Sequence, residues 1–530
     1  MVYRKSAVYC IVVLLIVCLA VPVYSQDSGA KTITAAELNT HLTFIASDEL
    51  KGRNTPSPEL KIAAKYLATV VESYGFKPLM PDGTFFQKIP IYYVNVSETG
   101  TNLTVKSSSG AQSFSFPEDF SASTRSNGFF SGEVVFVGFG LSAPDLDWDD
   151  YSNINVYGKV VIMLGGQLPP DHPLNTRENL RLISRRSNVA QERGAIAVLT
   201  VQSPPEEEGM IEANENFPNR ESTVYGDFNP ENAAFFSGNV RHNVAAALLD
   251  CDEDAVADMF EQISRGERIP GKSFTGKTAE IVVESHIIGV DQTQNVVAVI
   301  EGSDPVLKNE YVVYGAHYDH LGVRNQQVYN GADDDGSGTV ALLEIAQAFY
   351  VDRPRRSIII NWHTGEEKGL VGARYFTSNP PVPLEKISAQ INMDMIGRND
   401  PETVFVIGPG RISTELDGIT RDMNNKHIKM NLDYKYDAPD DPNRYYNRSD
   451  HYMYAQWGIP IVFLFTDVHE DYHRVTDTID KIDFSKMERI AKLAYYIGFE
   501  VAGKDELLKL DADPNITVRG KLYTPSQRIR

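Results

Sequence analysis

Cysteine is scarce in this chain of 530 residues, which contains only three. Two of them, Cys10 and Cys18, lie in an apolar segment at the N-terminus. If that segment is removed, only Cys251 remains, and the mature protein cannot form an internal disulfide.

Basic residues are also less numerous than acidic residues. The chain has 50 Lys and Arg residues against 71 Asp and Glu residues, a formal net charge of −21. A polyanionic ligand needs a basic face, so nucleic acid is excluded as a partner. The hydrophobic content of 42% allows sizeable cores, and the length exceeds that of one ordinary domain.

Long apolar runs are absent beyond the N-terminus. The opening stretch, "MVYRKSAVYCIVVLLIVCLAVPVYSQ", combines basic Arg4 and Lys5 with an apolar run and a small residue, Ser25. This pattern predicts a signal peptide at 1–25 and export to the periplasm or the extracellular space, without stable membrane insertion after cleavage. The alternative is an uncleaved signal anchor, because the apolar run is close to spanning length.

The rest of the chain changes character along its length. Residues 34–79 show helical periodicity, and 85–118 show short alternating stretches typical of strands. Short β-branched runs bounded by glycine then indicate a separate α/β module, and no internal repeat is visible. We predict a catalytic domain of 26–118 and 271–510, an insertion domain of 119–270 and a C-terminal tail of 511–530.

From about residue 290 the pattern alternates regularly between strand and helix. Four continuous apolar runs predict buried strands, and amphipathic stretches separate them. The predicted fold class is α/β, with a mostly parallel central sheet flanked by helices and a smaller inserted α/β domain. In such sheets ligands gather beyond the carboxyl ends of the strands. The four runs are "EYVVYGA", "RSIIINWHTG", "AQINMDMIG" and "GIPIVFLF".

Three consecutive aspartates, Asp333–Asp335 in "NGADDDGSGT", raise the question of a metal site. Taken alone they would fit a solvated loop that caps the following helix. However, each predicted strand is also followed by carboxylates or imidazoles, and several buried carboxylates cannot share one edge without cations. Oxygen and nitrogen ligands without thiolate suit Zn²⁺, with Mn²⁺ or Co²⁺ as weaker candidates. The residues that follow the strands are His317, Asp319, Glu366, Glu367, Asp394, His469, His473 and Asp477.

The motifs in this region resemble the dizinc aminopeptidase family, which includes secreted bacterial leucyl aminopeptidases, glutamate carboxypeptidase and the transferrin receptor. The matching stretches occur in the family's order over about residues 310–480, and "IASDELKGR" extends the likeness toward the N-terminus. Residues 119–270 resemble the protease-associated domain that many members carry as an insertion. The main matches are "GAHYDHLG", "NGADDDGSGT", "HTGEEKGLVGARYF", "INMDMIG", "SDHYMYAQWGIP" and "YHRVTDT".

The resemblance implies a ligand set for two zinc ions. His317 and Asp394 would hold one ion, and Glu367 and His473 the other. Asp334 would bridge the two. His469 competes with His473 for its place, but the "YHRVTDT" context favours His473.

The resemblance also implies catalytic roles. Glu366 would be the general base for a water activated by the two ions. Asp319 would orient His317 through the other ring nitrogen. Tyr446 falls where relatives place an oxyanion-stabilising tyrosine, although Tyr445 beside it makes that placement less secure.

Several polar neighbours have simpler interpretations. Asp333 and Asp335 would shape the loop or cap the helix, and this interpretation is favoured for Asp335. His320 and His363 stand beside predicted site residues, but such histidines more often satisfy backbone groups. For His451 the sequence does not distinguish between a packing role and a position in the pocket.

These patterns predict an exported zinc exopeptidase, an aminopeptidase that takes a peptide as its substrate. The alternatives are a carboxypeptidase or a glutaminyl cyclase of the same fold, the latter with one zinc, and a receptor-like binding protein that lost its metals. None of the matched ligand positions is degenerate, which favours catalysis. The sequence predicts neither the preferred terminal residue nor the oligomeric state.

Overall fold

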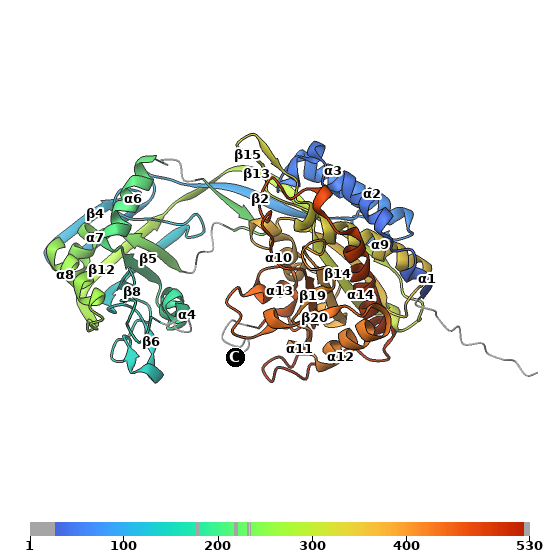
Figure 1. Cartoon of the computed structure of the whole chain (residues 1–530). Helices are drawn as coiled ribbons and strands as arrows, with labels where there is room; N and C mark the ends of the chain where they lie inside the picture. The colour runs from blue at the N-terminus through green and yellow to red at the C-terminus, as the bar shows by residue number, and fades with distance from the viewer. Residues whose placement is uncertain (1–26, 176–179, 217–220, 230–232, 234, 524–530) are drawn as a thin grey trace, which may run out of the picture. The chain divides into compact units, whose positions relative to one another are not determined.

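The computed structural model describes the chain except for residues 1–26, 176–179, 217–220, 230–232, 234 and 524–530. The predicted signal peptide lies outside the described residues. The chain forms two compact units (Figure 1). The first comprises the chain up to Lys88 and from Thr293 onward, and the second comprises Ile89–Gln292.

The first unit is built on a mostly parallel sheet. Its central strands β17, β14, β18 and β21 are adjacent in that order and run parallel. At the two sides, β13 pairs antiparallel with β17, and β19 pairs antiparallel with β21 and parallel with β20. This confirms the predicted α/β class. The bounds are β13 (Ser285–Ile300), β14 (Tyr311–His317), β17 (Ser357–His363), β18 (Ile387–Met393), β19 (Thr403–Ile407), β20 (Asn431–Asp433) and β21 (Ile461–Phe465).

Helices cover both faces of this sheet. Successive strand residues point to opposite faces, so Ile358 and Ile360 pack into one apolar core and Ile359 into another. The first core is completed by α2 (Ala35–Ile45), α3 (Pro58–Ser73), α9 (Gly338–Val351) and α14 (Phe484–Gly503). The second contains side chains from α10 (Val371–Ser378) and α13 (His451–Ala455) (Figure 1). Burial on both faces explains why the strands are continuously apolar.

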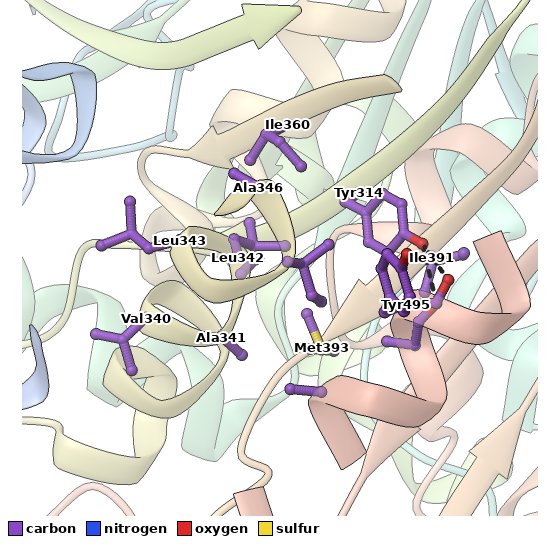
Figure 2. Close-up of a cluster of buried hydrophobic side chains, with 14 of the residues drawn as sticks. Tyr314, Val340, Ala341, Leu342, Leu343, Ala346, Ile360, Ile391, Met393 and Tyr495 are labelled. Carbon is purple, nitrogen blue, oxygen red and sulfur yellow. Dashed lines mark hydrogen bonds between the residues drawn. The ribbon is translucent and has the colours of Figure 1, made fainter. Parts of the chain in front are cut away.

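Helix α9 is central to the first core (Figure 2). Leu342 and Ala346 of α9 are fully buried, among the same core residues as Ile391 and Met393 of β18. Tyr314 of β14 reaches α14, where its hydroxyl donates a hydrogen bond to the Ala494 carbonyl at 2.9 Å. The helix that follows the aspartate triplet is thus fixed against the sheet.

Local signals explain where the helices begin. Ser57 caps α3 by accepting a hydrogen bond from the Leu60 amide at 3.0 Å, and Pro58 occupies the first helical position. Asp483 caps α14 in the same way through the Lys486 amide.

The second unit contains a sheet of seven strands in the order β11-β9-β8-β5-β12-β3-β4. It extends beyond the predicted insertion of 119–270, because β12 pairs antiparallel with β5 and β3 and so brings flanking segments into the same sheet. Helices α7 (His242–Leu249) and α8 (Glu253–Ser264) contribute to its main core. The strand bounds are β3 (Asn102–Ser107), β4 (Gly110–Ser115), β5 (Gly128–Phe136), β8 (Val160–Leu164), β9 (Ala197–Val201), β11 (Phe236–Val240) and β12 (Lys272–Val283).

The chain passes between the units through β2 (Phe86–Val96) and β13. The remaining elements are short or peripheral. They are α1 (Asp27–Ala30), β1 (Lys77–Pro78), β6 (Ser142–Ala143), β7 (Trp148–Asp149), α4 (Leu180–Ser184), α5 (Arg186–Glu192), α6 (Pro204–Asn216), β10 (Glu221–Tyr225), β15 (Gly322–Arg324), β16 (Gln327–Tyr329), α11 (Pro409–Ile412) and α12 (Thr414–Met423).

The described part of the predicted C-terminal tail packs against the first unit. The Gly520 amide donates to the Trp457 carbonyl, and the Tyr523 amide donates to the Gln456 carbonyl, both at 2.8 Å. Cys251 is a free cysteine. Among the helices of the described residues, none has the length and apolar character needed to cross a membrane.

Candidate metal centre

The predicted site residues follow the carboxyl ends of the parallel strands. His317 is the last residue of β14, and Asp394 directly follows β18. The turn Glu366–Lys368 follows β17, and the segment that contains His473 follows β21. Because these strands are parallel neighbours, their ends meet at one edge of the sheet, as the topology rule requires.

Asp334 lies between two imidazoles. Its Oδ1 is 3.2 Å from Nε2 of His317, and its Oδ2 is 3.1 Å from Nε2 of His473. The two histidines are far apart in the sequence and approach opposite oxygens of one carboxylate. This is the arrangement expected of a bridging ligand.

The remaining predicted ligands complete the two sides. On the first side, Nε2 of His317 is 3.5 Å from Oδ1 of Asp394. On the second, Nε2 of His473 is 3.2 Å from Oε1 of Glu367. The structure therefore brings together all five residues that the resemblance implied as ligands. Glu366 lies beside them, with Oε2 at 3.9 Å from Nε2 of His317.

Hydrogen bonds hold Asp394 in place. Its Oδ2 accepts a hydrogen bond from the Ser449 hydroxyl at 2.7 Å, which leaves Oδ1 directed toward His317. Ser449 in turn accepts a hydrogen bond from the Asn392 side chain at 3.0 Å. The "SDH" motif thus supports the site by orienting a ligand.

The aspartate loop is fixed through its backbone. Both oxygens of Asp335 accept main-chain amide hydrogen bonds, Oδ2 from His317 at 3.0 Å and Oδ1 from Gly338 at 2.8 Å. These bonds confirm the expectation that Asp335 shapes the loop and caps the helix. Oδ1 of Asp333 accepts a hydrogen bond from the Gly397 amide at 2.7 Å. The Asp334–Asp335 peptide bond is cis.

A buried arginine anchors the same loop from the N-terminal region. Arg53, the last residue of "IASDELKGR", is fully buried and donates to the main-chain carbonyls of Tyr318, Asn330 and Gly331. Burial lowers the pKa of Arg53 to about 10, although nearby aspartates including Asp319 oppose the shift.

The carboxyl groups of the cluster have pKa values that are shifted in opposite directions. Burial raises the pKa of the Glu366 carboxyl well above its usual range. Burial also opposes ionisation of Asp334, but the imidazoles of His320, His317 and His473 hold its pKa well below the ordinary value. The adjacent glutamates differ in the same way, because contacts with His320 and His473 outweigh burial and lower the pKa of Glu367 to about 2.

Several buried atoms of the cluster lack a well-formed hydrogen bond within the described part of the chain. They include Oδ2 of Asp334, Oε1 of Glu367, Oδ1 of Asp394 and both ring nitrogens of His320. Buried polar atoms without partners are costly, and a divalent cation would satisfy them. The donor set of carboxylate oxygen and imidazole nitrogen suits zinc. The residues present therefore fit the implied metal.

In the part of the chain that the structure describes, two groups of three residues have possible ligand atoms within 4.8 Å of one another. One consists of His317, Asp335 and Asp394, and the other of His320, Asp334 and Glu367. Both oxygens of Asp335 already accept amide hydrogen bonds, so it contributes to the loop. His320 is a residue that the sequence reasoning assigned to backbone satisfaction, and neither of its ring nitrogens has that role among the described residues.

Asp319 meets the second ring nitrogen of His317 through its main chain. Nδ1 of His317 is 3.0 Å from the main-chain carbonyl of Asp319, whereas the nearest carboxylate oxygen is 3.8 Å away. The turn after β14 brings the carbonyl back toward the ring. The Asp319 carboxylate instead accepts a hydrogen bond from the Glu366 amide at 3.1 Å.

The predicted oxyanion tyrosine does not contact the cluster in the described structure. Tyr446 packs under the Arg411 guanidinium, 4.0 Å from the ring centroid, and beside His451. Tyr472, which the sequence analysis did not single out, stacks on His473 with ring centroids 3.9 Å apart. Burial raises the pKa of the Tyr472 hydroxyl, and the charges of Asp334, Glu367 and Asp394 add to the shift. The sequence feature that could have drawn attention to Tyr472 is its position directly before the predicted ligand His473.

The other histidines have separate environments. Nε2 of His469 is 3.3 Å from Oδ2 of Asp333, so His469 faces the neighbour of Asp334 and not Asp334 itself. His363 contacts Tyr454 at 2.9 Å and Asp450 at 3.2 Å, which agrees with a packing role.

The fold and the cluster together define the class of the protein. A parallel α/β sheet with carboxylates and imidazoles beyond its carboxyl edge is the architecture of a metal-dependent hydrolase. Residues 295–498 match the model of peptidase family M28. The matched range contains the whole cluster.

Proteins that resemble this chain are named as aminopeptidases. The probable leucine aminopeptidase of Arthroderma benhamiae is 28% identical over 346 residues, which cover 57% of this chain and 92% of the relative. Leucine aminopeptidase 1 of Trichophyton equinum is 30% identical over 222 residues, 39% of this chain and 56% of the relative. Among solved structures, an aminopeptidase from Aneurinibacillus sp. strain AM-1 is 17% identical, with 92% of this chain and 98% of that chain covered and a TM-score of 0.47.

Proposed function

We propose that this protein is an exported zinc-dependent aminopeptidase that hydrolyses the N-terminal residue of peptides with two zinc ions per chain. The observation that carries the proposal is the position of Asp334, whose two oxygens face His317 and His473 at 3.2 and 3.1 Å. A carboxylate shared by two imidazoles is the geometry that a two-ion site needs.

The ligand assignment follows the two sides of the cluster. His317 and Asp394 would hold one ion, Glu367 and His473 the other, and Asp334 would bridge them. When bound, two such cations lower the pKa of a water molecule and polarise the scissile carbonyl.

Glu366 would move the proton in this reaction. Its carboxylate stands beside His317, and its side chain is 13% exposed, so it is partly screened from bulk water. The carboxylate would take a proton from the attacking water and return it to the leaving amine. Its main-chain amide donates to Asp319, which fixes the start of the turn that carries it.

Tyr472 would stabilise the oxyanion. Its partly buried ring stacks on His473, whose Nε2 faces Asp334 and Glu367. A hydroxyl donor at this position can stabilise negative charge that develops on the carbonyl oxygen.

The choice of an aminopeptidase is supported by the relatives, which are named leucine aminopeptidases. A free α-amino group needs a carboxylate partner near the metals, and Glu366 or Asp394 would supply it. Export rests on the N-terminal signal pattern of residues 1–25. We also propose that the second unit is a protease-associated domain, because residues 119–270 resemble one.

A substrate panel tests this function with the purified protein. Peptides with a free N-terminus should be cleaved from that end, and activity should be lost on chelation and restored by zinc. N-blocked peptides should resist cleavage. Cleavage of N-blocked peptides from the C-terminus would identify a carboxypeptidase, and release of pyroglutamyl products from glutaminyl peptides would identify a cyclase.

A further inference from the structure

His320 shares the oxygen atoms that face His473. Its Nδ1 is 3.0 Å from Oε1 of Glu367 and 3.7 Å from Oδ2 of Asp334. The same two oxygens lie 3.2 and 3.1 Å from Nε2 of His473. One ring nitrogen of each histidine therefore lies near the same two carboxylate oxygens.

The His320 ring is held in this orientation. The side chain is fully buried, and a Cβ added at Gly331 would lie 2.5 Å from its Cγ, so the glycine backbone packs directly against the ring. Its main-chain amide donates to the Arg53 carbonyl at 3.3 Å. Nδ1 lies 3.0 Å from Oε1 of Glu367, and within the chain as described Nε2 has no hydrogen-bond partner.

We propose that His320 is a further metal ligand, which makes the ion on the His473 side four-coordinate through His320, His473, Glu367 and Asp334. This inference rests on the proposed function, since it concerns the same two-metal site. It goes beyond that function because it makes the two sides unequal. The His473 side has two nitrogen and two oxygen donors, whereas the His317 side has one nitrogen donor and the carboxylates of Asp394 and Asp334.

The inequality has a chemical consequence. An additional protein donor strengthens the binding of the ion, and nitrogen donors favour zinc over harder ions, which prefer oxygen. The His473 side therefore binds zinc first and retains it longer, and the His317 side exchanges its ion more readily.

A rival role for His320 is to orient Glu367 through a hydrogen bond from Nδ1. The two roles separate on substitution. In His320→Asn the amide nitrogen replaces the Nδ1 donor but supplies no imidazole, so it rescues an orienting role and not a ligand role. His320→Ala removes both.

The experiment is equilibrium dialysis of the full chain against zinc buffered with a competing chelator, with bound metal counted by elemental analysis. The wild-type protein should show two binding steps of different affinity. Both His320→Ala and His320→Asn should weaken the tighter step by more than about 100-fold, beyond the usual effect of an outer-shell change. His317→Ala should weaken the other step. His469→Ala is the matched control, a buried imidazole that faces Asp333, and it should leave both steps unchanged.

Each result decides a different point. Wild-type affinity in His320→Asn would overturn the proposal in favour of orientation, and an unchanged tighter step in His320→Ala would overturn it outright. If the wild-type chain binds no zinc, the proposed function itself fails. Crystals of the wild type grown with zinc keep the test independent of variant folding. Nδ1 of His320 should then lie about 2.0–2.1 Å from an ion, and a ring outside bonding distance would overturn the proposal.

Discussion

The Asp477 carboxylate accepts a hydrogen bond from the main-chain amide of Asp334 at 3.2 Å. The amide of Asp333 donates to the same carboxylate at 3.1 Å. Asp477 was one of the metal-capable residues of the sequence, but its oxygens are directed at the backbone of the loop that carries Asp334. It is a positioning residue for that loop.

Replacement of Asp477 by Ala should lower zinc affinity by about 10- to 100-fold, because the loop loses the acceptor that fixes Asp334. Competition with a chromophoric chelator measures the change. Asp480→Ala is the control, because that nearby aspartate is exposed. Equal zinc affinity in the Asp477 variant and the wild type would refute the positioning role.

Replacement of Glu366 by Gln should reduce turnover by roughly 10²–10⁴-fold while both metals are retained, as loss of a general base requires. Glu367→Gln should instead lower the metal content, because Glu367 faces His473 at 3.2 Å. Steady-state kinetics together with metal analysis separates the two glutamates. A Glu366 variant that lost zinc would show that the roles are reversed.

Replacement of Tyr472 by Phe should lower kcat by about 10²–10³-fold if its hydroxyl stabilises the oxyanion. Tyr446→Phe should change kcat little, because Tyr446 packs against Arg411 and His451. The two variants remove the same atom from two tyrosines of one unit, so each controls for the other. The opposite ranking would restore the role that the sequence predicted for Tyr446.

Glu344 of α9 provides a pH dependence away from the metal centre. Burial raises the pKa of its carboxyl above the ordinary value of 4.5, although contact with His41 at 3.4 Å opposes this shift. In the pH window between the ordinary pKa and the raised pKa of the folded state, the folded state binds more protons than the unfolded state. The free energy of unfolding therefore falls as the pH rises through this window. Above this window, the contribution of the protonated Glu344 carboxyl to stability is lost completely.

Glu344→Gln should therefore lose less stability than the wild type as the pH rises above the ordinary carboxyl pKa of 4.5. Urea unfolding at a series of pH values measures the difference in free energy. Glu72→Gln, on the exposed face of α3, is the control and should follow the wild-type curve. A parallel curve for the Glu344 variant would contradict the assigned shift.

Much of the catalytic unit could be predicted from the sequence because its signals are local. The continuous apolar runs around Ile358–Ile360 predicted buried parallel strands, and the repeat of strand and helix predicted the edge where ligands gather. The boundaries of the second unit could not be predicted. Strands β3 and β12 look like parts of the flanking domain in sequence, and only their pairing assigns them to the second sheet.

The sequence by itself determined which kinds of donor atom are present and that they follow the carboxyl ends of neighbouring strands. Only the tertiary structure decided which donor faces which. It directed the carbonyl of Asp319, and not its carboxylate, to His317, and it placed Tyr472 and His320 beside the ligands. The physical reason is that side-chain direction depends on local turns, such as the packing of Gly331 against His320, and on contacts between distant segments, such as Asp477 against Asp334, 143 positions apart.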